Sequence, residues 1–219
     1  MGVRMCRMRL TFARHGESEA NVQQVYWNAP QGYGLTAQGK LQAAELAERL
    51  AGGNYSALYC SPVLRAVQTA QIVGRRLGLR PETADGLREY NVGILEGRRY
   101  SEETHALYMD VIHRWDRERE WDARIEGGES YNDMRARFLP FLRELEDAAD
   151  AGASGLNASA HVLLIAHGGI LRSMLPLFVS NLKTEDAFTW TFGYAMPIVV
   201  ERRGDAWVCL SWGDAVLAE

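Results

Sequence analysis

The chain is poor in cysteine, and its three thiols lie far apart. Cys6, Cys60 and Cys209 form no CxxC pair among the 219 residues. An odd number of cysteines in apolar surroundings is typical of unpaired thiols in a reducing compartment, so we expect a cytoplasmic protein.

The histidines show none of the close spacings that are typical of a metal site. His105 and His113 are eight positions apart, and His161 and His167 are six apart, so neither pair forms an HxxxH motif. We therefore predict that the protein binds no metal. The GxSxG turn of serine hydrolases is also absent from the sequence, which argues against a Ser-His-Asp triad.

Long apolar runs and a basic excess are missing as well. No segment approaches about 18 consecutive apolar residues, so we expect no membrane span. Residues 1–8 contain arginines but no apolar stretch, so we expect no secretory signal and a fold that begins near Met8. The net charge of −4 argues against nucleic-acid binding, which requires a broad basic surface.

Short apolar segments alternate with amphipathic ones along the chain. We predict strands over 8–14, 57–60, 80–83, 161–166, 195–202 and 207–212, and helices over 37–51, 62–77, 130–149 and 169–179. Thr36 and Ser61 are expected as N-caps, with Pro62 as the first helical residue, and Gly78 as a helix stop. This alternation predicts an α/β fold with a mostly parallel sheet covered on both faces. The length fits a single domain over 1–219, with a helical insertion over the site at about 98–127.

Two histidines follow apolar strands in the same local context. Residues 10–17 read LTFARHGE and residues 161–169 read HVLLIAHGG, so His15 and His167 each come just after a strand and just before a helix. Ligands of α/β sheets bind outside the carboxyl ends of the strands. The two histidines are therefore predicted to share a site, although these residues alone do not distinguish their roles.

The residues around His15 favour phosphate chemistry. A neutral imidazole, with an ordinary pKa of about 6.5, is a competent nucleophile toward phosphorus. The guanidinium of Arg14 offers a planar fork that matches phosphate oxygens, and Gly16 lets the backbone approach a ligand. The alternative for this tripeptide alone is a core histidine beside a surface arginine.

Three further segments could complete such a site. Arg65 lies in the first turn of a predicted helix, where a bound anion would relieve its conflict with the helix dipole. His167 could donate to a phosphate oxygen, while Gly168 and Gly169 present backbone N–H groups at a helix start. Glu89, held near phosphate oxygens, would have a raised pKa and could protonate a leaving alcohol. Each residue taken singly is explained equally well by solvation or by a local hydrogen bond.

Together these segments resemble the histidine phosphatase superfamily, in its phosphoglycerate-mutase-like branch. The resemblance covers residues 10–175 and rests on six motifs in the family's order: Arg14-His15-Gly16-Glu17-Ser18 with Asn21; Leu35-Thr36 to Gly39; Ser61-Pro62 through Arg65 to Gln68-Thr69-Ala70; Leu87-Arg88-Glu89 with Gly93, Glu96 and Gly97; Gly128-Glu129-Ser130; and His167-Gly168-Gly169.

The resemblance implies a fold and a set of roles. The fold would be a mostly parallel six-stranded sheet flanked by helices. His15 would be the phosphorylated nucleophile, Glu89 the proton donor that later activates water, and Arg14, Arg65 and His167 the ligands of the phosphoryl oxygens. Asn21 would support the pocket, and no metal or cofactor is implied.

The sequence departs from the family pattern in two stretches. The usual spacing between Asn21 and Leu35 is not kept, so no phosphate contact can be aligned there. Beyond Arg98-Arg99, the tract after Gly97 lacks the paired-arginine stretch associated with cofactor-dependent mutases. Arg117, Arg119 and Arg124 could serve in its place, and the alternative is that they lie on a solvated helix face.

These observations predict a metal-independent phosphomonoesterase that acts on a small-molecule phosphate ester. The alternatives are a cofactor-dependent phosphoglycerate mutase and a non-catalytic phospho-ligand binder. The candidates for an aromatic lip around the substrate, as opposed to packing residues, are Tyr26, Trp27, Tyr33, Tyr90, Trp115 and Trp121. The oligomeric state is not readable from the sequence.

Overall fold

The computed structural model describes residues 7–218, so Cys6 lies outside the described part of the chain. The strands are β1 (Arg9–Arg14), β2 (Ala57–Cys60), β3 (Pro81–Thr83), β4 (His161–Ala166), β5 (Pro197–Arg203), β6 (Ala206–Trp212) and β7 (Ala215–Val216). The α-helices are α1 (Glu19–Val22), α2 (Ala37–Leu50), α3 (Leu64–Leu77), α4 (Glu102–His113), α5 (Tyr131–Asp150), α6 (Gly168–Phe178) and α7 (Thr184–Thr189).

One mixed sheet of seven strands in the order β3-β2-β4-β1-β5-β6-β7 forms the centre of the molecule. The first four strands in that order are parallel, and β5, β6 and β7 add to it antiparallel. The predicted α/β class is confirmed. The sheet has seven strands instead of six because of β7, whose two residues are too few to leave a periodic signal.

The register of the central pair brings the two histidine motifs together. Strands β1 and β4 are parallel neighbours in which Arg14 is paired with Ala166. His15 and His167 are the next residues of the two strands, so both leave the sheet at the same edge. The sheet itself therefore brings the two histidines to one edge, as the sequence predicted.

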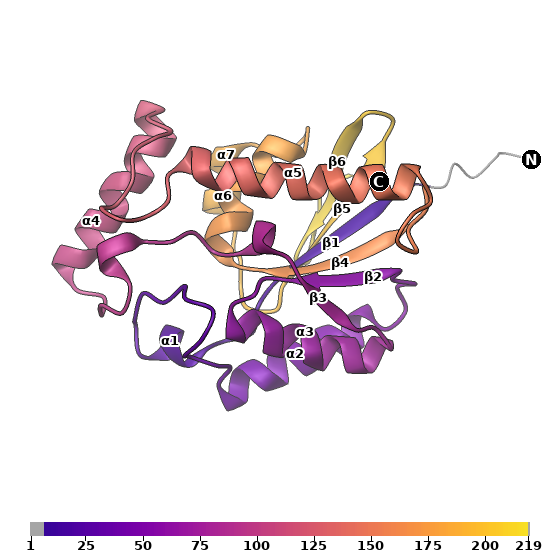
Figure 1. Cartoon of the computed structure of the whole chain (residues 1–219), viewed down its shortest axis with the longest axis horizontal. Helices are drawn as coiled ribbons and strands as arrows, with labels where there is room; N and C mark the ends of the chain where they lie inside the picture. Colours follow the sequence, from indigo (N-terminus) through magenta and orange to yellow (C-terminus); the bar gives the residue numbers. More distant parts are fainter. Residues whose placement is uncertain (1–6, 219) are drawn as a thin grey trace, which may run out of the picture.

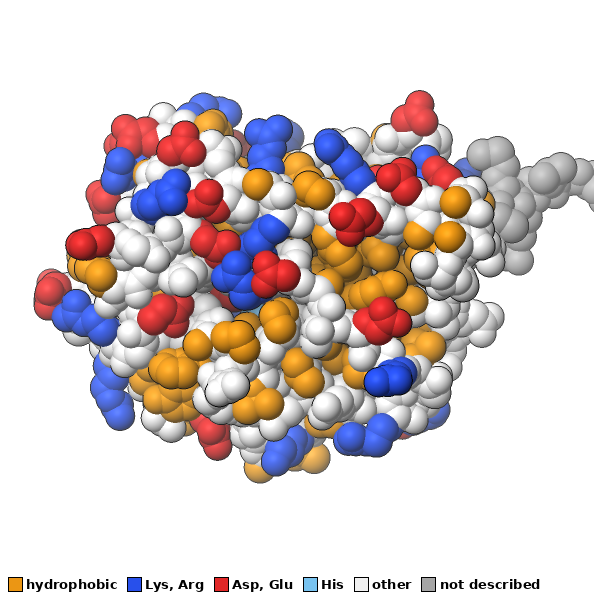
Figure 2. Space-filling model, in the orientation of Figure 1, with side chains coloured by type: hydrophobic (Ala, Val, Ile, Leu, Met, Phe, Trp, Pro, Cys, Tyr) orange, Lys and Arg blue, Asp and Glu red, His pale blue; other side chains and the backbone are white. Residues whose placement is uncertain are grey.

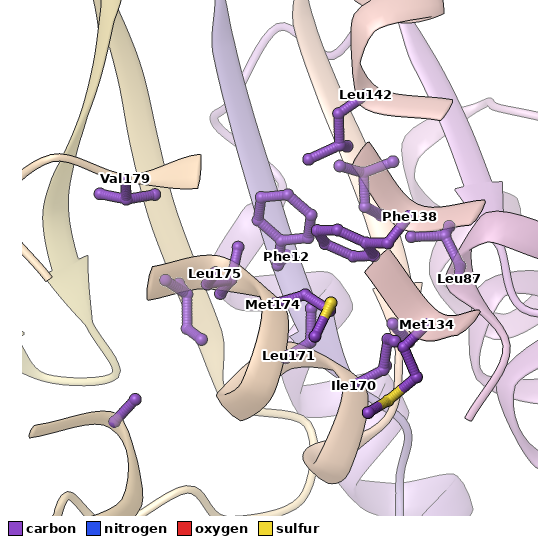
Figure 3. Close-up of a cluster of buried hydrophobic side chains, with 14 of the residues drawn as sticks. Phe12, Leu87, Met134, Phe138, Leu142, Ile170, Leu171, Met174, Leu175 and Val179 are labelled. Atoms are coloured by element: carbon purple, nitrogen blue, oxygen red, sulfur yellow. The ribbon is translucent and has the colours of Figure 1, made fainter. Parts of the chain in front are cut away.

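Helices cover the sheet on both faces (Figure 1). Helices α2 and α3 pack together on one face, while α5 and α6 lie on the other. Figure 3 shows how the second face is filled, with Phe12 of β1 beside Phe138 of α5 and side chains of α6 around them. The two phenyl rings are stacked with centroids 6.3 Å apart, and both are fully buried.

The predicted helix ends are confirmed in two cases and wrong in one. The Thr36 hydroxyl caps α2 by accepting from the Gly39 N–H at 2.9 Å, and Gly78 ends α3 with φ +70°. The N-cap of α3, however, is Val63 and not Ser61, so the helix begins two residues later than predicted. The Ser61 hydroxyl accepts from the Val63 N–H and is also hydrogen-bonded to His167 Nε2. The short helices α1 and α7 were not predicted.

The stretch from about 98 to 127 contains α4 and a π-helical turn at Arg114–Glu118. In Figure 1, α4 lies at the end of the molecule opposite both chain termini. A single domain with this stretch as an insertion stays a prediction.

Figure 2 shows the molecule from the same side as Figure 1. Acidic and basic side chains are interspersed over the face in view, without a broad area of either sign.

Candidate active site

A polar pocket of about 180 Å³ lies at the edge of the sheet where β1 and β4 end. Six of the seven predicted site residues line it, and the seventh, His167, lies with its ring centroid 5.0 Å from that of His15. The lining consists of Arg14, His15, Ala20, Asn21, Val25, Tyr26, Trp27, Asn28, Arg65, Glu89, Tyr90, Val92, Tyr100, Tyr108, Gly168 and Gly169.

The hydrogen bonds of His15 determine which of its ring nitrogens is available for reaction. Its Nδ1 lies 2.6 Å from the Gly16 carbonyl oxygen, which can only accept, so Nδ1 carries the proton. Burial, together with the Arg65 and Arg14 guanidiniums, holds the pKa of His15 well below its ordinary value of 6.5. The imidazole is therefore neutral near pH 7, and its Nε2 keeps a lone pair on the pocket side.

Arg65 is the cation directly beside that lone pair. The first turn of α3 carries it into the pocket, where its Nε donates to His15 Nε2 at 3.0 Å. Its two Nη atoms donate to the Trp27 carbonyl at 2.7 Å and to Asn28 Oδ1 at 3.0 Å. The side chain is only 5% exposed, and burial lowers the pKa of Arg65 to about 10, which leaves it charged at neutral pH.

His167 is the N-cap residue of α6 and is completely buried. Its Nε2 lies 2.7 Å from the Ser61 hydroxyl, while Nδ1 has no hydrogen-bond partner among the described residues. Ser61 Oγ also accepts from the Val63 N–H. When the Ser61 hydroxyl donates to Nε2, the His167 proton sits on Nδ1. Burial, Arg65 and His15 lower the pKa of His167 well below 6.5.

Arg14 has a buried donor that the described residues leave without a partner. Its Nη1 donates to the Phe192 carbonyl at 2.9 Å, and its guanidinium lies 4.2 Å from the centroid of the Tyr194 ring. Its Nε is buried and makes no hydrogen bond to any described residue. A buried donor without a partner costs free energy. An anion in this pocket would satisfy Arg14.

Glu89 reaches the pocket from the loop that precedes the short 3-10 turn Gly93–Leu95. Its carboxylate accepts from the backbone N–H groups of Gly169 and Ile170 at 2.8 and 2.7 Å, and from that of Tyr90 at 3.2 Å. Burial raises the pKa of Glu89, although these N–H groups and Arg65 oppose the shift.

Asn21 and Gly168 form parts of the pocket wall. Asn21 Oδ1 accepts from the Ser18 N–H and hydroxyl at 3.1 and 2.8 Å, within the capping box of α1. This bonding fixes its amide at the rim. Gly168 is the first residue of α6, and a Cβ there would lie 3.4 Å from Arg14 Nε, so glycine keeps the space beside that guanidinium open.

Asn28 was missed by the sequence reasoning. Besides accepting from Arg65, it donates through Nδ2 to the Tyr90 carbonyl at 2.9 Å and through its backbone N–H to Glu96 at 2.8 Å. It lies in the irregular stretch between Asn21 and Leu35, and no local pattern marks it. The sequence pattern predicts Ser61 only as a helix cap, and it gives no signal for Tyr100 or Tyr108.

The six aromatic candidates divide into three that line the pocket and three that do not. Tyr26, Trp27 and Tyr90 line the pocket. Tyr33 does not, but packs edge-on against Trp27. Two others belong to packing: Trp115 is buried in the core with its Nε1 donating to the Ala123 carbonyl, and Trp121 packs against Tyr131.

The three arginines considered as lip residues do not line this pocket. Arg117 and Arg124 form ion pairs with Asp116 and Asp133, and their side chains are 68% and 46% exposed. Arg119 is the C-cap of the π-helical turn. The structure therefore supports the interpretation that these arginines lie on a solvated surface.

Among the side chains that the structure describes, no three His, Cys, Asp or Glu side chains are grouped so that they could hold a metal ion. Nor does the described part of the chain contain a helix with the length and apolarity needed to cross a membrane.

The fold and site define an α/β protein with a polar pocket at the carboxyl edge of its sheet. The pocket contains two arginines, a carboxyl group and a histidine that is a candidate nucleophile. A family model described as histidine phosphatase superfamily (branch 1) matches residues 10–215. The chain belongs to this superfamily, which confirms the predicted family and, at that level, the enzyme class.

The names of similar proteins and solved structures state different activities. A 2,3-bisphosphoglycerate-dependent phosphoglycerate mutase of Azorhizobium caulinodans is 30% identical over 207 residues, which cover 91% of this chain and 94% of the relative. A mycobacterial glucosyl-3-phosphoglycerate phosphatase has a TM-score of 0.78 at 24% identity, covering 94% of this chain and 99% of that one. An alpha-ribazole phosphatase from Shigella flexneri has a TM-score of 0.74 at 22% identity, covering 97% and 100%. These two structures share the fold.

Proposed function

We propose that the protein is a phosphomonoesterase that transfers a phosphoryl group from a small phosphate ester to His15 Nε2 and then to water. The observation that carries this proposal is the state of the His15 ring, whose neutral Nε2 faces a pocket in which the buried Arg14 Nε has no hydrogen-bond partner among the described residues. A nucleophile surrounded by buried donors suits a charged phosphoryl group.

In the first step, Arg65 exchanges its bond to Nε2 for a phosphoryl oxygen, and Arg14 and His167 bind the others. The Nε2 lone pair forms a P–N bond while the P–O bond to the alcohol breaks. Glu89 gives its proton to the leaving oxygen. Its raised pKa, which a dianionic ester would raise further, favours the protonated carboxyl that this step needs.

In the second step, the Glu89 carboxylate takes a proton from a water molecule as the water oxygen attacks phosphorus. The P–N bond breaks, its electron pair returns to Nε2, and inorganic phosphate leaves. Glu89 is protonated again and His15 is neutral, so the site is ready for another ester.

The second candidate is a phosphoglycerate mutase, which the names of the relatives at 30% identity favour. A mutase must hold a bisphosphate, so it needs cations beyond those that bind one phosphoryl group. Among the described residues that line this pocket, Arg14 and Arg65 are arginines and none is a lysine. Arg172 lines an adjoining cavity that shares Arg14 and Gly168 with the pocket. We place hydrolysis first because the two arginines beside His15 suit a single phosphoryl group. Rapid isomerisation of 3-phosphoglycerate with a trace of 2,3-bisphosphoglycerate, with little release of phosphate, would favour the mutase instead.

The test of the mechanism is the variant His15→Ala with p-nitrophenyl phosphate as substrate. We expect turnover to fall at least about 1,000-fold, as happens when a catalytic nucleophile is removed. His105→Ala, an exposed histidine of α4, is the matched control and should stay within twofold of the native enzyme, about the scatter of such assays. An alkaline quench with ³²P-labelled ester should trap a base-stable, acid-labile phosphoprotein in the native enzyme only. Near-native turnover by His15→Ala would overturn the mechanism, and absence of the phosphoprotein would revive the non-catalytic binder.

A further inference from the structure

Four tyrosines form one side of the pocket and have no role in the steps above. They are Tyr26, Tyr90, Tyr100 and Tyr108, and we call them the tyrosine wall. They come from three separate segments of the chain, so their meeting is a product of the fold. Such a wall offers flat apolar faces with polar hydroxyl tips.

Backbone hydrogen bonds hold two of these segments side by side. The Tyr26 N–H donates to the Arg98 carbonyl at 3.0 Å, and the Gly97 N–H donates to the Tyr26 carbonyl at 2.7 Å. The Tyr100 N–H donates to the Gln24 carbonyl at 2.7 Å. These bonds bring the backbone of Tyr26 and that of Tyr100 together, and with them the two rings.

The rings of the wall form a continuous row in the order Tyr100, Tyr26, Tyr108, Tyr90. The Tyr26 centroid lies 4.2 Å from that of Tyr100 and 5.5 Å from that of Tyr108. The Tyr90 and Tyr108 rings are stacked, and their hydroxyls are hydrogen-bonded to each other. Tyr26 and Tyr90 are 6% and 4% exposed, but Tyr100 is 50% exposed. Tyr100 thus supplies the open ring surface, supported from behind by Tyr26.

The wall begins beside Glu89. Tyr90 follows Glu89 in the chain and donates its N–H to Glu89 Oε1 at 3.2 Å, and a Cβ built on Gly169 would lie 2.6 Å from a Tyr90 ring carbon and 2.8 Å from the same carboxylate oxygen. The Tyr90 hydroxyl is bonded to that of Tyr108, and the ring contacts continue from Tyr108 through Tyr26 to Tyr100. In the proposed function Glu89 protonates the leaving oxygen, so the adjacent tyrosines face the alcohol portion of the ester.

We propose that the tyrosine wall binds the alcohol portion of the substrate, and that the open ring of Tyr100 stacks on a planar ring carried by that alcohol. The substrate class is a phosphate monoester whose alcohol bears an aromatic or heteroaromatic ring. This inference rests on the proposed phosphomonoesterase function. Aromatic pairs of this kind change affinity about threefold to tenfold.

The experiment compares benzyl phosphate with propyl phosphate, two alkyl esters with similar leaving groups, of which only benzyl phosphate carries a ring. We expect the native enzyme to prefer benzyl phosphate in kcat/KM by about threefold to tenfold. Tyr100→Ala should lose this preference because its kcat/KM falls for benzyl phosphate and stays the same for propyl phosphate. Tyr100→Phe should keep the preference because the ring remains. Leu107→Ala, an exposed residue of α4 outside the pocket lining, is the control and should match the native enzyme.

The outcomes separate this inference from the proposed function. Equal kcat/KM for the two esters in the native enzyme, or an unchanged preference in Tyr100→Ala, would overturn the stacking role while hydrolysis stands. Hydrolysis of neither ester, with no phosphoprotein formed, would instead contradict the phosphomonoesterase itself. Circular dichroism of each variant shows whether a loss reflects unfolding.

Discussion

At the scale of single residues, Glu89 experiences opposing influences. Burial raises its pKa, whereas the N–H groups of Gly169, Tyr90 and Ile170, together with Arg65, lower it, and the net shift is upward. His15 is displaced the other way, because burial and two guanidiniums lower its pKa. The proposed reaction needs a neutral imidazole and a protonated carboxyl, and these two shifts widen the pH range in which both are present.

The variant Glu89→Gln tests the proton-donor role. We expect kcat/KM for an alkyl phosphate to fall about 100-fold or more, because its alkoxide leaves only with a proton. The loss should be much smaller for p-nitrophenyl phosphate, whose phenolate is stable without one. An equal loss for both esters would contradict the assignment.

The pH profile provides a second measurement on the same residue. Activity should decline as pH rises through the raised pKa of Glu89, and the acid limb due to His15 should lie below pH 6.5. The alkaline limb should be absent from the residual activity of Glu89→Gln. An alkaline limb that persists in this variant would point to another acid.

At the scale of elements, Glu129 joins the Glu89 loop to α5. Its carboxylate accepts from Arg88 at 3.0 and 3.2 Å, from Arg137 of α5 at 2.9 and 3.3 Å, and from the Asn91 N–H at 2.8 Å. Burial raises its pKa, but Arg137, Asn91 and Arg88 outweigh burial, so the net shift is downward. Residues on both sides of Glu89 are thereby held by one carboxylate, which makes Glu129 a positioning residue.

We predict that Glu129→Gln lowers kcat about tenfold with little change in KM, because small misplacements of a catalytic group are costly and the phosphate ligands remain. The alkaline limb of the pH profile should also shift, since Glu89 would lose its fixed surroundings. Glu48→Gln is the matched control, because it weakens an exposed ion pair with Arg76 that contributes little. A change in KM alone, with kcat and the pH profile intact, would count against positioning.

At the scale of the whole molecule, buried neutral histidines couple stability to pH. His161 begins β4, at the end of the sheet opposite the site, with Nε2 2.7 Å from Thr11 Oγ and its ring against Tyr55. Burial, aided by Arg9, lowers the pKa of His161 to about 4. The unfolded chain therefore binds the proton first, and stability is lost as pH falls.

We expect the free energy of unfolding to be level above about pH 6.5 and to decrease as pH falls from there toward 4. His161→Gln should make this decrease shallower, because one of the contributing groups is removed, and should leave phosphatase turnover unchanged. Urea unfolding at a series of pH values measures the effect. An equally steep pH dependence in the variant would show that His161 does not contribute.

Local patterns predicted the framework of the fold but not its small elements. The strands ending at Arg14 and Ala166 were visible because buried parallel strands are continuous apolar runs. Thr36 and Gly78 were readable because capping depends on neighbouring residues. The α3 start was misplaced because the Ser61 hydroxyl is committed to His167, which lies 106 positions away.

The sequence by itself determined the order of the motifs, and with it the family, the sheet and the residues that meet at its edge. Only the tertiary structure decided which nitrogen of His15 is free, because that depends on the Gly16 carbonyl and on Arg65 approaching from α3. The tyrosine wall was likewise decided by the fold, because Tyr26 lies far in the chain from Tyr90, Tyr100 and Tyr108. Periodicity and capping are local and are written in neighbouring residues, whereas a hydrogen bond between distant side chains exists only after the backbone has brought them together.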